Sequence, residues 1–193
     1  MIPDSLAALD LATESFRVHL AVIRDEDWTA ATPCTDWDVH YLVAHVVGGN
    51  RFASMVLDGQ TAAEAMEVVM GAAQLGADPL GDFDTSTVDQ RRQVRRAEAL
   101  DQLVSHPLGV LSGERFLRMR VFDIALHSWD LAVAIGRNAE LDNELVEAVL
   151  EIVSQEALGM AFGIEPCGDV GRDASPMEQL LDLSGRCAKP GPT

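Results

Sequence analysis

Apolar residues recur every three or four positions along most of the chain, a spacing that predicts a series of amphipathic α-helices. The expected helices cover residues 4–24, 36–57, 62–75, 88–104, 114–137, 143–160 and 176–184. Strand-like alternation of apolar and polar residues is lacking, apart from a short extended piece expected within residues 105–112. The pattern therefore predicts an all-α fold, arranged as a bundle of helices.

Polar and helix-breaking residues set the expected helix boundaries. Pro33 interrupts the chain just before Thr35, which is a favourable N-cap for the second helix. Ser175 and Glu178 form a capping-box sequence at the start of the last helix, with a proline at the first helical position. Residues 76–87 contain three Asp, two Gly and one Pro, which predicts a loop between the third and fourth helices.

The longest of these helices, residues 114–137, carries polar side chains within an otherwise apolar stretch. Asp123 and His127 are four residues apart, so they lie on the same side of the helix, and Asp130 lies near the same face. Charged groups on a buried helix are paired or hold a metal ion. Two interpretations stay open for Asp123 and His127: hydrogen-bonded core residues or metal ligands. Asp130 either orients His127 or accepts a bond from a loop or an arginine.

A third candidate ligand lies on the second helix. His45 stands at the edge of its apolar face, which is able to meet the inward face of the 114–137 helix in an antiparallel bundle. Together, His45, Asp123 and His127 would make a site of two imidazoles and one carboxylate. That set is expected of catalytic zinc with an open fourth position, and nickel, iron and manganese tolerate it as well.

Two further features of the second helix leave alternatives open. Cys34 precedes it and is either a thiolate activated by the helix N-terminus or a small buried apolar side chain. Gly48 and Gly49 either let a neighbour approach closely or mark a bend.

The length and charge of the chain bound its organisation and partners. With 193 residues it is expected to form a single domain over residues 1–187, followed by a flexible tail at 188–193. Acidic residues number 31 against 14 basic ones, which gives a formal charge of -17. Such a field repels nucleic-acid phosphate and anionic lipid, so we expect neither nucleic acid nor membrane as a partner.

Segments that would direct the chain to a membrane or out of the cell are not evident in the sequence. Apolar runs stay well below the roughly 18 residues needed to span a bilayer. The N-terminus carries Asp4 and lacks the basic region of a signal peptide. The three cysteines are odd in number and form no CxxC motif, so we expect reduced thiols and a cytoplasmic protein.

Four of the basic residues gather in the expected fourth helix, at Arg91, Arg92, Arg95 and Arg96. We expect a solvated face that pairs with nearby acids. The alternative is an anion subsite for a carboxylated substrate or a thiol cofactor.

Two segments resemble a known family. Residues 32–52, TPCTDWDVHYLVAHVVGGNRF, resemble the signature TPC-x-x-W-x-V-x-x-L-x-x-H of the DinB-like helical bundles. Within these, the segment is most similar to the actinobacterial metal-binding branch that contains the N-terminal domain of mycothiol-dependent maleylpyruvate isomerase. A second signature, R-x-x-D-x-x-x-H-x-W-D-L-A-x-A-x-G, matches from Arg120 to Gly136, and the SGR at residues 184–186 is also similar to that branch.

The resemblance implies a DinB-like, up-and-down four-helix bundle with additional short helices. It also implies a divalent metal ion, zinc before nickel, iron or manganese, on His45, Asp123 and His127. The isomerase has a glutamate where this chain has Asp123, whose side chain is one methylene shorter. Members of the family often pair, so we also expect a homodimer.

Two functions follow from this resemblance as expectations. The first is a metal-dependent transferase or isomerase, in which a small thiol such as mycothiol attacks a small electrophilic substrate; a variant replaces the thiol with water and gives hydrolysis. The second is a metal-binding protein without catalysis, acting as a stress-related or regulatory module. A coordination position open to a pocket favours the first function, and a closed shell favours the second.

Overall fold

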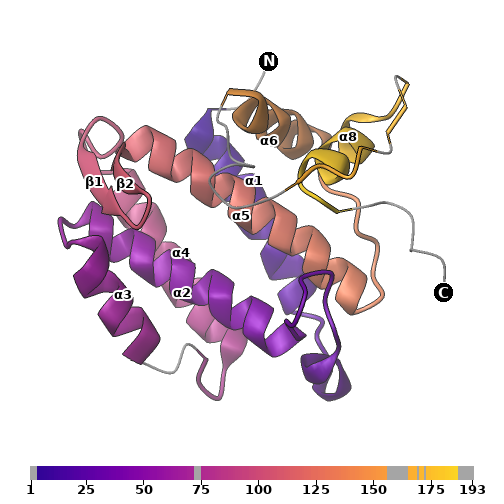
Figure 1. Cartoon of the computed structure of the whole chain (residues 1–193). Helices are drawn as coiled ribbons and strands as arrows, with labels where there is room; N and C mark the ends of the chain where they lie inside the picture. The colour runs from indigo at the N-terminus through magenta and orange to yellow at the C-terminus, as the bar shows by residue number, and fades with distance from the viewer. Residues whose placement is uncertain (1–3, 72–74, 156–164, 169, 172, 187–193) are drawn as a thin grey trace.

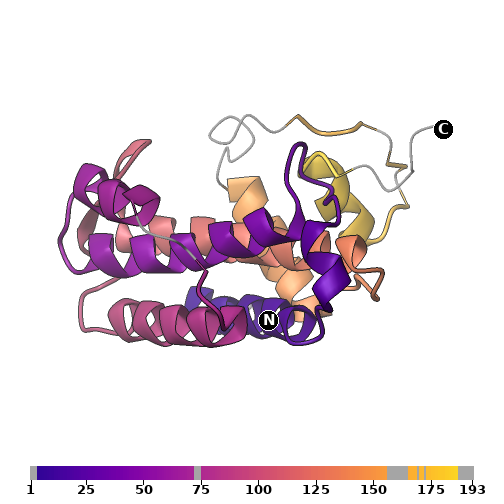
Figure 2. The same cartoon turned by 90° about the horizontal axis from the view of Figure 1, so that it is seen from below.

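Four long helices bury their apolar faces against one another in two layers. They are α1 (Ser5–Leu20), α2 (Val39–Leu57), α4 (Pro79–Val94) and α5 (Gly113–Ala134). Figure 2 shows α2 and α5 in one layer and α1 and α4 in the other. The computed structural model describes residues 4–71, 75–155, 165–168, 170–171 and 173–186. The predicted all-α bundle is confirmed.

The core of the bundle comes from residues at helical spacing. On α1, Leu9 and Phe16 are fully buried, and the ring of Phe16 stacks on Phe83 of α4 with centroids 5.1 Å apart. Leu117 and Ile124 supply the buried face of α5. This common core fixes α2 and α5 side by side, which sets the relative position of the candidate ligands.

Shorter elements surround the four helices (Figure 1). A 3₁₀ turn, η1 (Asp25–Thr29), joins α1 to α2, and α3 (Ala62–Gly71) packs on α2. The extended piece expected within 105–112 is part of an antiparallel hairpin of β1 (Leu103–His106) and β2 (Gly109–Ser112). Beyond α5 come α6 (Asn143–Gln155) and α8 (Pro176–Leu183).

The fourth helix lies earlier in the chain than predicted, so the expected loop at 76–87 and the expected helix at 88–104 are both corrected. Asp78 caps α4 by accepting the N–H of Gly81 at 3.0 Å, and a proline occupies the first turn. Phe83 is fully buried, so the helix gains core contact from the segment whose Asp and Gly content predicted a loop. Burial and capping outweigh composition here.

The start of α2 also differs from the expectation. Thr35 was predicted to cap this helix, but Asp38 does so, with its Oδ1 atom accepting the N–H of Tyr41 at 2.8 Å. Asp36 has a positive φ of 64°, which turns the chain between the two positions. The helix therefore begins three residues later than the capping sequence suggested.

Other predicted boundaries are confirmed. Gly59 ends the α2 segment with a φ of 100°, and the capping box of Ser175 and Glu178 is present at α8. The expected tail at 188–193 and the end of the expected 143–160 helix lie outside the described residues.

Within the described part of the chain, none of the helices has the length and apolarity needed to cross a membrane. The expectation of reduced thiols holds for Cys34, which is free, and is wrong for Cys167, which is disulfide-bonded. The cytoplasmic location, which rested partly on reduced thiols, stays a prediction.

The arginines of α4 and the turn after it form the solvated, paired face that was expected. Arg91 and Arg95 both bind Asp10 of α1, with nitrogen–oxygen distances of 2.8 and 2.6 Å. Arg96 lies 3.1 Å from Asp58, and Arg92 lies 2.9 Å from Asp89. The alternative of an anion subsite formed by these arginines gains no support from their positions.

Candidate metal centre

The three predicted ligands converge between α2 and α5. The Nε2 atom of His45 lies 3.2 Å from Oδ1 of Asp123, and the Nε2 atom of His127 lies 3.4 Å from the same oxygen. One ligand atom from each residue lies within 4.8 Å of the others. Zinc–nitrogen bonds of about 2.0–2.1 Å place two ligands of a tetrahedral ion about 3.3–3.4 Å apart. The donor set and its spacing therefore fit a divalent metal ion.

The site is more open on one side than on the other. The His45 side chain is 37% exposed, whereas those of Asp123 and His127 are 18% and 10% exposed. Its open side faces a cavity of about 400 Å³, to which His45 and Asp123 contribute. A ligand in that cavity would therefore reach the centre from the His45 side.

Arg120, one turn before Asp123 on α5, fixes the second carboxylate oxygen. Its Nη1 atom donates to Oδ2 of Asp123 at 2.6 Å, and Nη2 donates to Asn50 Oδ1 at 2.9 Å. The guanidinium lies against the backbone of Gly49, where an ideal Cβ atom would be 2.5 Å from Nη1. Gly49 therefore serves the close approach that was one of its two expected roles. With Oδ2 engaged, Asp123 offers Oδ1 alone to a metal ion.

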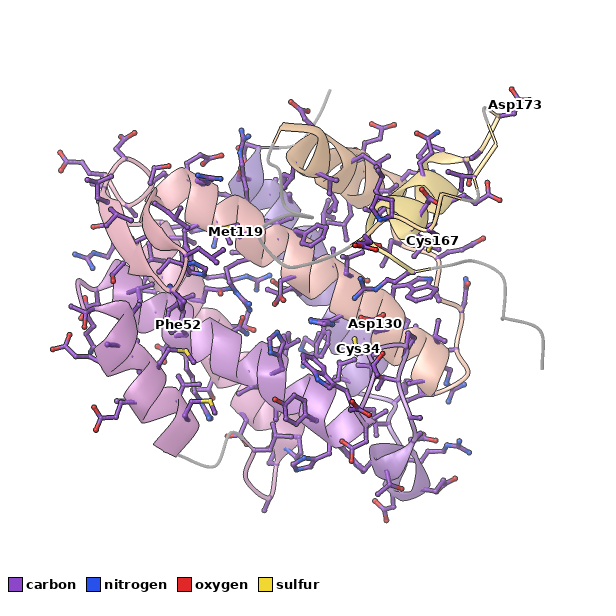
Figure 3. The ribbon with its side chains drawn as sticks, in the orientation of Figure 1. Cys34, Phe52, Met119, Asp130, Cys167 and Asp173 are labelled. Carbon is purple, nitrogen blue, oxygen red and sulfur yellow. The ribbon has the colours of Figure 1, made fainter. Side chains whose placement is uncertain are left out.

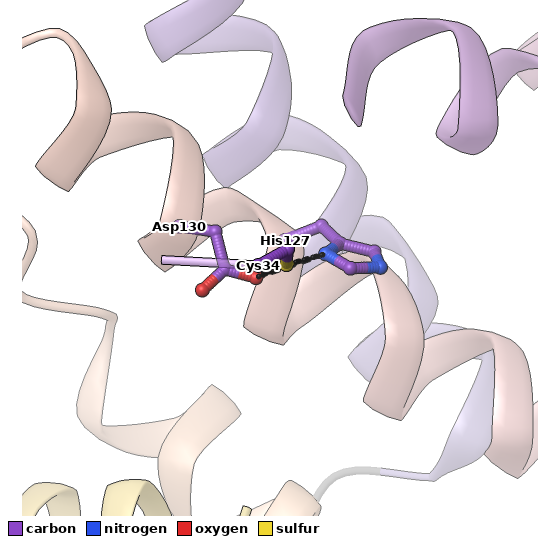
Figure 4. A group of neighbouring side chains, drawn as sticks. All are labelled: Cys34, His127 and Asp130. Atoms are coloured by element: carbon purple, nitrogen blue, oxygen red, sulfur yellow. Dashed lines mark hydrogen bonds and ion pairs between the residues drawn. The ribbon is translucent and has the colours of Figure 1, made fainter. Parts of the chain in front are cut away.

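Asp130 orients the imidazole of His127 (Figure 4). Nδ1 of His127 lies 2.9 Å from Oδ2 of Asp130, and we assign the proton to Nδ1 because a carboxylate can only accept. The tautomer leaves Nε2 free to bind a metal ion on the Asp123 side. A carboxylate in this position is the usual outer partner of a ligating histidine.

Asp130 is itself fully buried and held by other donors. Arg186, which follows α8, forms a two-pronged pair with it at 2.8 and 2.6 Å. The thiol of Cys34 donates to Oδ2 of Asp130 at 3.3 Å, with Sγ 3.9 Å from Nδ1 of His127. Cys34 was expected to be either an activated thiolate or a small buried apolar side chain. It is neither, because its thiol is half-buried and donates a hydrogen bond. These three residues and His127 tie the loop before α2, α5 and the end of α8 together.

The charges around the centre set the protonation of its members. Burial alone would raise the pKa of Asp123, but the positive charges around it, first His45 and then Arg120, hold that pKa well below its usual range. Burial lowers the pKa of His127, yet the carboxylates of Asp123 and Asp130 outweigh it and raise that pKa well above its usual range. A divalent cation bound here would take the place of the proton on His127.

Trp37 packs against both candidate histidines. Its ring lies 4.9 Å from that of His45 and 5.5 Å from that of His127, measured between centroids. The two imidazoles meet edge to face at 5.0 Å. This contact restricts the ring positions without engaging the Nε2 atoms.

Sequence reasoning found the three converging residues but assigned no role to Arg120, Asn50 or Arg186. Arg120 lies three residues before Asp123, a spacing that places both on one side of the helix. Arg186 lies 56 residues from Asp130, so no spacing indicated this contact. Its signals were the SGR at residues 184–186 and the expectation that Asp130 accepts a bond from a loop or an arginine. Phe52 and Met119 line the cavity. In Figure 3 they lie farther along α2 and α5 than Cys34 and Asp130, which lie close to each other.

Comparison with known proteins gives relatives for the whole chain. Uncharacterised proteins from two strains of Mycobacterium tuberculosis are each 31% identical to it over 205 residues, covering 96% of this chain and all of each relative. Two crystal structures of mycothiol-dependent maleylpyruvate isomerase, one of them a histidine-to-alanine variant, superimpose with TM-scores of 0.58 and 0.61. Each superposition covers 75% of this chain and 65% of the isomerase chain.

The likeness to the isomerase structures concerns the fold, because sequence identity is 15% and 13%. It confirms the predicted DinB-like bundle. The family model of the mycothiol maleylpyruvate isomerase N-terminal domain matches residues 9–132, a range that includes Cys34, His45, Asp123, His127 and Asp130. The chain therefore belongs to the family of the mycothiol maleylpyruvate isomerase N-terminal domain.

Proposed function

We propose that this protein binds a divalent metal ion at His45, Asp123 and His127 and uses it to activate a small thiol of the mycothiol type. The thiol would be transferred to a small electrophilic substrate or would catalyse its isomerisation. One observation carries the proposal: the two Nε2 atoms lie 3.2 and 3.4 Å from the same Asp123 oxygen, as in a tetrahedral ligand set.

The surrounding residues support the proposed ligands in distinct ways. Asp130 accepts the Nδ1 proton of His127 and so keeps Nε2 available. Arg120 engages one oxygen of Asp123 and favours its ionised form. These contacts hold two of the three donors ready before a metal ion arrives, so little side-chain ordering remains when it binds.

The chemistry requires a metal ion with a position left for the reacting group. When bound, such an ion lowers the pKa of a thiol or water beside it and supplies a nucleophile at neutral pH. Zinc fits a site of two imidazoles and one carboxylate, and nickel, iron and manganese accept the same donors. The family and the names of the solved relatives support a thiol of the mycothiol type.

The open side of the centre favours catalysis over a closed binding module. The cavity of about 400 Å³ has His45 and Asp123 in its wall, so a substrate placed there would lie next to the proposed metal position. A non-catalytic metal-binding or stress-related module would have no use for this access.

Metal analysis of the purified protein beside two histidine variants tests the proposed ligands. We expect His45→Ala to lower metal affinity by at least about 10-fold, since loss of an outer partner alone typically costs that much. His40→Ala is the matched control, because His40 lies on the same helix, is exposed and faces Trp28. Equal metal content in all three proteins would show that the proposed ligand set is wrong.

A cobalt-substituted sample then distinguishes the proposed thiol-dependent enzyme from a metal-binding module without catalysis. Addition of mycothiol should produce a sulfur-to-cobalt charge-transfer band, because the thiol would enter the open coordination position. A cobalt spectrum unchanged by mycothiol would favour the binding module.

A further inference from the structure

The cavity beside the candidate metal centre has walls from four separate parts of the fold. α2 contributes Phe52, α3 contributes Met66 and Met70, and α5 contributes Phe116 and Met119. His106 of the hairpin also lines it. Since His45 and Asp123 belong to the same wall, a molecule in this cavity would contact the reacting centre directly. Its volume, about 400 Å³, falls within the range of small-molecule sites.

The wall is mainly apolar and adaptable. Phe52 and Phe116 lie with ring centroids 6.3 Å apart and present aromatic surface. The three methionines that line the cavity have flexible, polarisable side chains, which suit apolar ligands of varied shape. A ligand that matches this wall is apolar over most of its surface.

The positive charge at the cavity is already compensated. Among the described lining residues, Arg120 is the one with a permanent positive charge. Its guanidinium donates to the carboxylate of Asp123, to Asn50 at 2.9 Å and to Gln90 at 3.3 Å. A substrate carboxylate would have to displace Asp123 from Arg120. Breaking such a buried ion pair is strongly destabilising.

His106 offers no charge in its place. Its Nδ1 atom accepts the N–H of Leu108 at 3.2 Å, and its ring lies beside Phe52 and Phe116. Burial, followed by the charge of Arg120, lowers the pKa of His106 and favours the neutral imidazole. The acidic chain as a whole, with a formal charge of -17, also disfavours an anionic ligand.

We propose that this cavity is the substrate subsite of the centre and that it selects an uncharged, largely apolar electrophile, with an aromatic or branched group against Phe52, Phe116 and Met119. Among the described side chains of the wall, by contrast, a small dicarboxylate finds no unpaired cation, and a metal ion in the centre would be the cation within its reach. The identification of the ligand as a substrate rests on the proposed function. The preference of the cavity for an uncharged ligand rests only on the side chains of its wall.

Binding of an uncharged fluorophore, N-phenyl-1-naphthylamine, to the purified protein tests the inference. We expect Met66→Glu to weaken probe binding by about 10-fold or more, because the added carboxylate would be desolvated against an apolar ligand. Val68→Glu is the matched control: it adds the same charge to α3 at a residue that is 53% exposed and outside the cavity wall. We expect it to change binding by no more than about twofold.

Competition for the same probe identifies the class of ligand. In protein freed of metal by a chelator, acetophenone, an uncharged aromatic ketone, should displace the probe at lower concentration than maleate, a dicarboxylate. The inference is overturned if maleate competes better, if the probe does not bind, or if the two glutamate variants bind it equally well.

The same experiment distinguishes this inference from the proposed function, because probe binding needs no metal. Probe binding that is sensitive to Met66→Glu, in a protein that takes up no metal ion when one is added, would sustain the cavity preference and reject the proposed centre. Metal binding that depends on His45, in a protein that fails to bind the probe, would sustain the centre and reject the cavity preference.

Discussion

At the scale of single residues, the proposed centre depends on how the second nitrogen of His127 is held. Asp130 is fully buried and accepts from Nδ1 of His127, from Arg186 and from the thiol of Cys34. Burial alone would raise the pKa of Asp130, but Arg186 first and then His127 lower it. The carboxylate is therefore ionised and keeps Nε2 of His127 directed at Asp123.

Replacing Asp130 by Asn should weaken metal binding with all three proposed ligands intact. We expect a 10- to 100-fold rise in the metal dissociation constant, roughly the effect of losing an outer partner. Competition with a chromophoric chelator measures it. Asp84→Asn, which removes a half-exposed partner of Arg17, is the control and should leave the affinity unchanged. Equal affinities for both variants would show that Asp130 does not support the centre.

At the scale of elements, the helices that carry the proposed ligands were more predictable than those that surround them. α2 has an apolar face at helical spacing, and α5 is a long, mostly apolar stretch without proline, so the helical positions of His45, Asp123 and His127 could be predicted from the sequence. The first half of α4 was missed, because its Asp and Gly residues indicate a loop unless Asp78 is recognised as a cap and Phe83 as core. Local composition there conflicts with tertiary burial, and burial prevails.

Which residues of the shorter elements meet the centre and its cavity was beyond sequence reasoning. The pairing of Arg186 with Asp130 and the placement of His106 in the cavity wall both depend on how α8 and the hairpin dock on α2 and α5. Neither has a local spacing that indicates its partner. The three converging residues were predictable because His45 lies at the edge of the apolar face of one helix and Asp123 and His127 lie one turn apart on another.

The capping box of α8 gives a pH dependence at this scale. Hydrogen bonds from the hydroxyl and backbone N–H of Ser175 lower the pKa of Glu178 from its usual 4.5. An acid whose pKa is lowered on folding stabilises the fold above its unfolded pKa, and this contribution is lost as pH falls through the folded value. Protection of the α8 amides from hydrogen exchange should therefore decline below pH 4.5.

Glu178→Gln isolates this effect, because the amide carries no titratable charge. Its α8 amides should show a flatter pH dependence over the same window. An identical decline in the variant and the natural protein would assign the effect to other acids, such as Asp130.

At the scale of the whole molecule, the charge of -17 gives the protein a long-range field that draws cations and repels anions. The arginines near α4 do not offset the negative potential around the centre, because they are paired with acids on α1 and after α2. The homodimer implied by the family stays a prediction, which sedimentation equilibrium tests against the chain mass of 20.8 kDa.

The field should speed the arrival of a metal ion at the proposed centre. We expect the association rate of a divalent cation to fall about 10-fold as salt rises from roughly 10 mM to 1 M, because the Debye length shrinks from about 30 to 3 Å. Stopped-flow measurements with cobalt provide the rate. Binding of the uncharged fluorophore is the control and should not weaken as salt is added. A salt-independent cobalt rate would contradict a role for the overall charge.

The close contact between Gly49 and the guanidinium of Arg120 means that a change at one of these two positions affects the residue tolerated at the other. A methyl group at position 49 would lie 2.5 Å from Nη1 and 2.8 Å from Cζ of Arg120. A larger residue there therefore requires the guanidinium to move away from its partners Asp123 and Asn50, a shorter partner at position 120, or a wider spacing of α2 and α5. Among homologues, we expect the glycine and the arginine to be kept or replaced together, with compensatory pairs more frequent than single changes.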